Sequence, residues 1–246
     1  MDVSAVAREL ALLSERMHRA PDPEHTAAEV VEYARHQLGA DRAGITMIQR
    51  DARLDTVAPT DGTVEKIDGL QHELGEGPCH DAAWNGETLV SQDLRDEPRW
   101  PRWAPAAVSF GVGSVLGVEL VDKAHERRIG AVNLYWDRPR VFTSDEIALA
   151  HLISRHAALA LAASLNAEGL RLAMDTRKRI GQAQGILMER HGLDEDQAFA
   201  VLRRYSQNNN VKLRDLAEHL VETKELPHHS TSREVDAGGE DSSRSR

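Results

Sequence analysis

Residues Thr176–Leu226 read TRKRIGQAQGILMERHGLDEDQAFAVLRRYSQNNNVKLRDLAEHLVETKEL. Apolar residues recur in this segment at helical spacing in three groups: Ile180, Ala183 and Leu187; Ala198, Val201, Leu202 and Tyr205; and Leu213, Leu216, Ala217 and Leu220. Gly192 is suited to end the first helix, and Asp194 with Gln197 forms a capping box for the second. Because each helix is apolar on one side, the segment predicts three helices that close on one small core.

Two glycines in the first helix need a separate explanation. Gly181 and Gly185 lie four residues apart and therefore on one face, and each costs about 1 kcal/mol relative to Ala inside a helix. One interpretation is a tight contact between helices, with Gln184 hydrogen-bonded at its edge. The other is a surface that a ligand approaches closely. The sequence leaves both open.

The same segment resembles the ANTAR domain, an RNA-binding module of bacterial transcription antitermination regulators. The residues that carry the resemblance are Arg179-Ile180, Ala183, Gly185-Ile186-Leu187-Met188, Ala198-Phe199, Leu202-Arg203 and Leu213-Arg214-Asp215-Leu216-Ala217. The family often has Lys where Gln184 stands. The resemblance implies an RNA-binding set made of Arg177, Arg179, Gln184, Gly185, Arg203, Arg204, Lys212 and Arg214, in which basic side chains neutralise phosphates. Solvated basic residues are also ordinary on helices, and this remains the alternative.

Composition places the chain among globular proteins. It has 246 residues, 41% of them hydrophobic, a mean hydropathy of −0.48 and a net charge of −10. No run of about 18 apolar residues is present, and the N-terminus lacks a basic start followed by an apolar run. We therefore expect neither a transmembrane helix nor a signal peptide. The single cysteine, Cys79, fits a reducing cytosol.

Charge is unevenly distributed along the chain. Residues 171–226 contain ten Lys and Arg against nine Asp and Glu, whereas residues 1–170 contain 17 against 27. Basic residues are thus relatively concentrated in the C-terminal helices. A nearly neutral module is still a weak electrostatic signal for RNA, so the RNA hypothesis rests mainly on the resemblance.

The N-terminal two thirds of the chain mixes helix and strand patterns. We expect helices at 3–17, 26–38, 60–70, 104–110 and from 143 or 144 to about 166, and strands at 43–48, 54–58, 88–91, 114–121 and 128–136. Residues 74–81 read as a glycine-rich loop. This is an α+β pattern, with a mostly antiparallel sheet flanked by helices and then an all-α module.

Residues from about Pro23 to Leu165 resemble a GAF domain. The resemblance is carried by Leu74-Gly75-Glu76-Gly77-Pro78-Cys79, Asp93-Leu94, Arg99-Trp100-Pro101, Gly111, Ser114-Val115, Gly130–Tyr135 and Phe142-Thr143. It implies a sheet covered by helices on one face, with a small-ligand pocket on the other. The expected organisation is an N-terminal helix (1–22), a GAF-like sensor (23–165), an ANTAR-like three-helix module (166–226) and a disordered tail (227–246).

Candidate pocket residues lie in two loops of the GAF-like region. They are Gly77, Cys79, Trp100 and Trp103, around an unidentified small molecule. For the tryptophans, a lid over the core is the alternative. Cys79 is expected to be a packing residue, with a redox-sensing thiol as another interpretation. The sequence contains no metal-ligand spacing and no catalytic motif, so we expect no metal and no enzyme.

The helix expected over residues 145–166 raises the question of a dimer. Ile147, Ala150, Ile153, Ala157, Ala160, Leu161 and Leu165 recur at spacings of three and four, which favours a parallel helix pair in a homodimer through 145–165. The alternative is that this stripe packs on the chain's own sheet. Asn166–Gly169 interrupts the apolar pattern, and its glycine is interpreted either as a hinge or as an irregularity of the helix.

Together these features predict a cytoplasmic sensor–effector regulator. Its ANTAR-like module would bind hairpin RNA in nascent transcripts and control antitermination, gated by a signal at the GAF-like domain. RNA hairpin loops expose unstacked bases, which suits such a module. The other function class is a ligand-binding dimerisation or interaction module that does not bind RNA. No membrane partner is expected.

Overall fold

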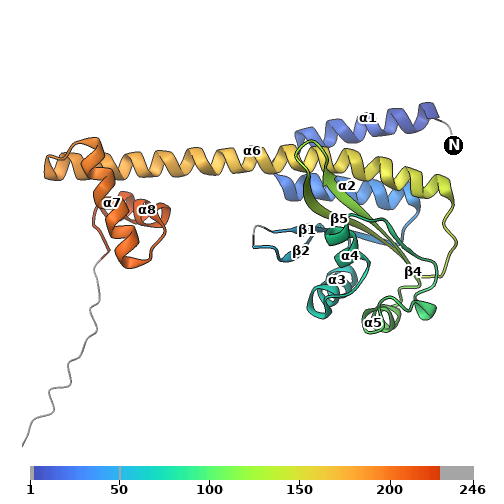
Figure 1. Ribbon diagram of the computed structural model, residues 1–246. Coiled ribbons are helices and arrows are strands. Elements are labelled where there is room, and N and C mark those ends of the chain that lie inside the picture. Colours follow the sequence, from blue (N-terminus) through green and yellow to red (C-terminus); the bar gives the residue numbers. More distant parts are fainter. Residues whose placement is uncertain (1–2, 50, 228–246) are drawn as a thin grey trace, which may run out of the picture. The chain divides into compact units, whose positions relative to one another are not determined.

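The computed structural model describes residues 3–49 and 51–227 (Figure 1). The chain divides after Gly169 into two compact units, which are described separately below as the N-terminal unit and the C-terminal unit. Most of the predicted tail, residues 228–246, lies outside the described residues. The predicted fold class, α+β followed by an all-α module, is confirmed.

The N-terminal unit is built around a five-stranded sheet. Its elements are α1 (Val3–Arg19), α2 (Pro23–Leu38), β1 (Arg42–Ile48), β2 (Leu54–Val57), α3 (Gly62–Leu74), α4 (Pro78–Asn85), β3 (Leu89–Ser91), a 3-10 turn (Leu94–Asp96), α5 (Trp103–Ser109), β4 (Ser114–Asp122), β5 (Arg127–Trp136) and the first part of α6 (Ser144–His191). The strand order is β2-β1-β5-β4-β3, and every pairing is antiparallel.

Both faces of the sheet are covered by helices (Figure 1). Successive residues of β5 point to opposite faces, as a pleated strand requires. Leu134 packs with α1, α2 and α6 in the larger core, whereas Tyr135 packs with α3, α4 and α5 in a second core. The resemblance implied helices on one face and a pocket on the other. Here α3, α4 and α5 close over that second face.

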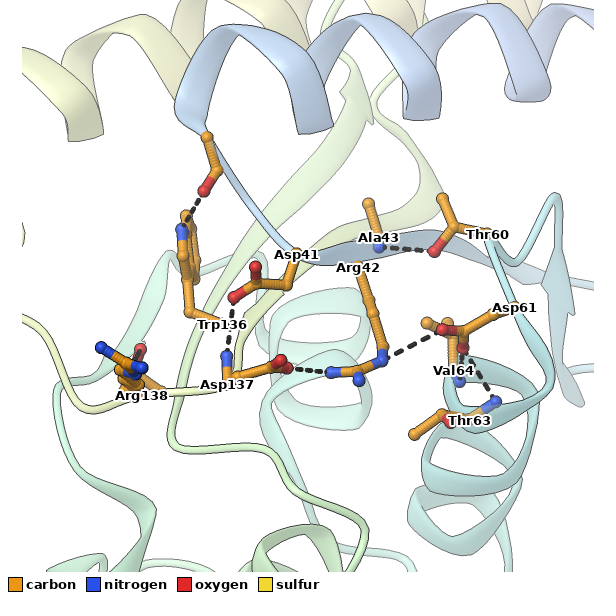
Figure 2. A network of polar contacts seen from close by, with 12 residues as sticks. Asp41, Arg42, Ala43, Thr60, Asp61, Thr63, Val64, Trp136, Asp137 and Arg138 are labelled. Carbon is orange, nitrogen blue, oxygen red and sulfur yellow. Dashed lines mark hydrogen bonds and ion pairs between the residues drawn. The ribbon is translucent and has the colours of Figure 1, made fainter.

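An ionic network fixes the start of β1 to both neighbouring segments (Figure 2). The Arg42 guanidinium contacts the carboxylates of Asp61, at 3.0 Å, and of Asp137. Asp61 also caps α3 by accepting hydrogen bonds from the backbone N–H groups of Thr63 and Val64. One arginine therefore joins β1, the end of β5 and the N-terminus of α3, the helix that carries the buried polar residues described below.

One element was missed at the sequence level. Residues 74–81 were expected to be a loop, but Pro78 begins α4, and Cys79 follows it inside that helix. Proline is favoured at the first position of a helix, where its missing N–H has no partner to lose. Gly77, the residue before it, has φ 136°, a backbone conformation that favours glycine.

α6 corrects two expectations. It runs without interruption through Asn166–Gly169, because Ala and Glu are good helix formers and one glycine costs only about 1 kcal/mol. The stripe proposed as the dimer seam lies instead in the core of the N-terminal unit, where Ile153 and Leu161 are 1% and 0% exposed. The sheet, not a partner, therefore covers these side chains.

Among the described residues, α6 is the one helix whose length and composition would allow it to cross a membrane. Only 44% of its apolar window is buried in the structure. Four apolar residues of this window pack against the sheet in the larger core: Leu149, Ile153, Ala157 and Leu161. A core helix of this kind meets the same criteria, so the feature is weak support for a membrane span.

The C-terminal unit consists of the end of α6, α7 (Glu195–Asn209) and α8 (Leu213–Thr223). Asp194 and Gln197 form the predicted capping box, and Gly192 adopts the left-handed conformation after α6. The core contains Ala183, Leu187, Ala198, Leu202, Leu216, Ala217 and Leu220. Val201, which was expected in this core, is 37% exposed.

Candidate functional site

The two glycines of the C-terminal unit lie on an exposed face of α6. Gly181 and Gly185 are both exposed, and a Cβ atom built on either would meet no other atom within 4 Å. The packing interpretation required a close neighbour at these positions within the chain. None is present among the described residues, so packing within the chain does not explain these glycines and their face is open. Arg177 precedes Gly181 by four residues and is exposed on the same face.

Gln184 has a role inside the module. Its side-chain amide donates a hydrogen bond of 3.2 Å to the backbone carbonyl of Glu195, the first residue of α7. The bond joins α6 to the first turn of α7, where the backbone carbonyls point along the axis of α7. Gln184 therefore helps to hold the two helices together beside the exposed glycines.

The predicted basic residues do not all share one surface. Arg179 follows Arg177 by two residues, which is more than half a turn of helix, so the two point in different directions. The side chains of Arg203 and Arg204 point about 100° apart around α7, because consecutive residues of a helix are separated by that angle. Arg204 lines a groove in the C-terminal unit, and Arg203 does not.

Two further predicted residues lie at α8. Lys212 is its N-cap residue, with an exposed side chain that does not cap the helix. The Arg214 guanidinium is 3.0 Å from the carboxylate of its neighbour Asp215, and both side chains are about half exposed. A surface pair of this kind is weak, so Arg214 can still exchange its partner for a phosphate.

The predicted pocket residues of the N-terminal unit are close together but buried. Cys79, Trp100 and Trp103 belong to one core cluster, and the two indole rings meet edge to face at 5.7 Å. Trp100 Nε1 donates to Asp81 and Trp103 Nε1 to the carbonyl of Ile67, each at 2.8 Å. The tryptophans are thus buried in the second core, as in the lid considered above as the alternative.

A buried polar cluster that was not predicted from the sequence lies in the same core as these tryptophans. Asp68 of α3 is completely buried. Its two oxygens accept hydrogen bonds from five neutral side chains: Tyr135, Gln71 at 3.1 Å, Cys79 at 3.4 Å, Asn133 at 3.4 Å and Thr56 at 3.4 Å. Gln71 also contacts the Cys79 sulfur at 2.7 Å and accepts from its backbone N–H at 2.8 Å. The spacing of Asp68 and Gln71 on the buried side of α3 was the available sequence signal.

The electrostatics of this cluster follow from its burial. Removal from water raises the pKa of Asp68 from 3.8 to about 6, although the surrounding hydrogen bonds oppose this rise. Burial, and next the nearby Asp68 charge, raise the pKa of the Cys79 thiol well above its usual value. The thiol is therefore protonated near neutral pH, which makes it a poor nucleophile.

We expect Asp68 to make the stability of the N-terminal unit depend on pH. Between about pH 4 and pH 6 the folded protein holds a proton that the unfolded chain has released, so this contribution is present at low pH and is lost as pH rises. The interval between 3.8 and about 6 corresponds to about 3 kcal/mol. The Asp68→Asn variant should gain stability relative to wild type as pH rises from about 4 to about 7.

Urea unfolding followed by circular dichroism at several pH values measures this difference. Asp55→Asn, which changes an exposed carboxylate on β2, is the matched control. The difference in unfolding free energy between this control and wild type should stay constant over the same pH range. A difference between Asp68→Asn and wild type that is constant over this pH range would contradict the expectation.

No group of three or more His, Cys, Asp or Glu side chains within residues 3–49 and 51–227 is arranged to hold a metal ion. Those side chains are spread over both units or paired with arginine, as Asp61 is with Arg42. The buried carboxylate of Asp68 is likewise surrounded by hydrogen-bond donors.

Comparison with known proteins agrees with both units. Residues 20–162 match the GAF domain, and residues 168–221 match the ANTAR domain. No curated protein sequence matches the chain.

Solved structures show the same N-terminal fold. The GAF domain of a phosphoenolpyruvate-protein phosphotransferase from Coxiella burnetii is 17% identical with a TM-score of 0.54, and the match covers 69% of this chain and 99% of that one. The corresponding domain from Acinetobacter is 12% identical with a TM-score of 0.51, covering 68% and 97%. Free methionine-R-sulfoxide reductase from Neisseria meningitidis, solved with its substrate, is 16% identical with a TM-score of 0.51, covering 68% and 95%. At these identities the likeness shows the fold alone. Because the GAF match covers more than half of the chain and an ANTAR match follows it, the chain belongs to the GAF domain family and is a sensor–regulator of the GAF and ANTAR type.

Proposed function

We propose that this chain is a cytoplasmic regulator whose ANTAR domain binds hairpin RNA in nascent transcripts and controls transcription antitermination. The observation that carries the proposal is the exposed face of α6 in the domain that matches ANTAR, where Gly181 and Gly185 leave open space beside Arg177. A backbone without side chains lets a nucleic acid approach closely, and a guanidinium can pair with its phosphates. Lys212 and Arg214 add basic groups at α8.

The GAF domain is the sensing part of this proposal. Its buried cluster around Asp68, Gln71 and Cys79 gives the second core polar groups, and the Trp100–Trp103 lid would have to move for a small molecule to reach them. The role proposed for this site is binding of a small molecule without catalysis, because the thiol is protonated. The ligand's occupation of this core would then control the ANTAR domain.

A homodimer through residues 145–165 remains part of the proposal, with a different seam. Leu152 and Leu159 lie two turns apart on α6, and they are 38% and 60% exposed. Residues seven apart share a face of a helix pair, and exposed leucines there favour pairing with a second copy. The consequences for mutants are given in the Discussion.

We expect the full chain to bind a two-hairpin RNA, and the fragment that ends at Gly169 not to bind it. The reason is that the fragment keeps the core of the GAF domain but lacks the ANTAR domain. An electrophoretic mobility shift with the two-hairpin RNA, and with the same bases in shuffled order, measures this. Binding that resides in the fragment, or equal binding of the shuffled RNA by the full chain, would refute the proposal in favour of an interaction module.

A further inference from the structure

The C-terminal unit contains a groove that the residues discussed so far do not explain. Its volume is about 840 Å³, and it lies where the end of α6, α7 and the chain after α8 meet. Its floor is apolar and comes from all three helices, through Leu187, Val201 and Leu220. Its rim is polar, with Arg190, Arg204 and Asn208. The groove therefore exists only when the three helices are folded together.

The rim carries two kinds of hydrogen-bond donor: one side chain that is already bonded to the chain and two that are exposed to solvent. Arg190 donates a hydrogen bond of 2.6 Å to the backbone carbonyl of Lys224, which holds its guanidinium at the edge of the groove. Arg204 and Asn208 are four residues apart on α7, both exposed, and thus side by side. Tyr205, half buried, also lines the groove, and its hydroxyl donates to the carbonyl of Pro227. An aromatic ring is thereby held at the groove wall.

These features match one kind of occupant. Two guanidinium groups stand on the rim, and Glu225 is the one acidic residue among the groove's lining residues within the described chain, so the rim favours an anion. The apolar floor and aromatic wall suit a flat ring, and an amide such as that of Asn208 can read polar edges. A flat ring with polar edges, attached to a phosphate, is a nucleotide.

We propose that this groove receives an unstacked base from an RNA hairpin loop, with Arg204 at the adjacent phosphate and Asn208 at the base edge. This inference rests on the proposed function and adds a second contact to it. Leu187 follows Gly185 by two residues, so the groove opens on another side of α6 than the glycine face. The glycine face then holds the RNA backbone, and the groove reads the sequence.

The chain offers a matched pair of variants to test the groove. Val201 and Phe199 are 37% and 38% exposed on α7, but only Val201 lines the groove. RNAs with two hairpins and randomised loops are first selected on the full-length wild-type chain. Val201→Trp should fill the groove and lower the affinity for the selected RNA by about tenfold or more, as the loss of one stacked base does. Phe199→Trp should leave that affinity unchanged.

A second measurement identifies the occupant directly. With p-benzoylphenylalanine in place of Val201, illumination of the complex should join position 201 to a loop nucleotide, whereas the same group in place of Phe199 should not. A cross-link from position 201 only to residues 228–246 or to a second protein copy would overturn the groove proposal. Equal RNA affinity of Val201→Trp and Phe199→Trp would also overturn it, while leaving the proposed function intact. If no RNA is enriched on the wild-type chain, the proposed function fails and the groove proposal fails with it.

Discussion

Gly185→Leu is expected to abolish RNA binding while the melting temperature of the protein stays the same or rises. A Cβ at Gly185 would meet no atom within 4 Å beyond its own stretch of helix, so we expect a leucine there not to overpack the domain. It also replaces a poor helix former by a good one, a gain of about 1 kcal/mol. The side chain would stand where the RNA backbone must approach, and the contacts there would be lost. Thermal unfolding by circular dichroism and RNA affinity at two salt concentrations measure the two effects.

Gly69→Leu is the matched control for this prediction. Gly69 lies within α3 of the GAF domain, and a Cβ there also meets no atom within 4 Å. The same chemical change should therefore raise stability without any effect on RNA. Gly185→Ala should fall between wild type and Gly185→Leu in RNA affinity. A Gly185→Leu protein that melts early would show that this face packs against something, and the RNA interpretation of the glycines would be wrong.

Ile153→Asp and Leu161→Asp are each expected to unfold the GAF domain. Both side chains are almost fully buried in the larger core, against the sheet, and the described neighbours there are apolar. A carboxylate in such a place loses its hydration without gaining a partner, and the packing of the original side chain is lost as well. The sum is on the order of 4 kcal/mol or more, a large part of the stability of a typical domain. Urea unfolding and the near-ultraviolet circular dichroism of the buried tryptophans report the loss.

Leu159→Asp separates this effect from dimerisation. Leu159 lies on the same helix but is 60% exposed, so the change should leave the fold intact and yield monomers in light scattering. If Leu161→Asp gave a folded monomer, the buried stripe would be the dimer seam after all. If Leu159→Asp remained as dimeric as wild type, the pairing of α6 through Leu152 and Leu159 would be wrong.

The elements with local signals could be predicted from the amino-acid sequence. Apolar residues that alternate or run together placed the strands of the sheet to within about a residue or two, as for β4. The capping box at Asp194 placed the start of α7. The three apolar groups after Thr176 specified the small core of the C-terminal unit. These signals depend on neighbours three or four residues away, so the primary structure contains them.

Prediction from the sequence was wrong where one residue pattern is compatible with two different structures. Glycine and proline before Cys79 suggested a loop, although the same residues begin α4. Apolar residues on α6 suggested a dimer seam, because an apolar stripe does not say which surface covers it. The sheet that covers Ile153 and Leu161 comes from strands up to about a hundred residues earlier in the chain.

The environments of the candidate sites depend on how the chain packs. Packing buries Asp68 among Tyr135 and Asn133, which are more than 60 residues away in sequence, and Cys79, which is 11 residues away. It also placed Arg204 in a groove and Arg203 outside it, and left Gly185 open. Burial and open space are properties of the packed chain, since each depends on atoms brought together from separate segments. A residue's type gives its chemistry, and the fold alone fixes whether water, protein or a ligand surrounds it.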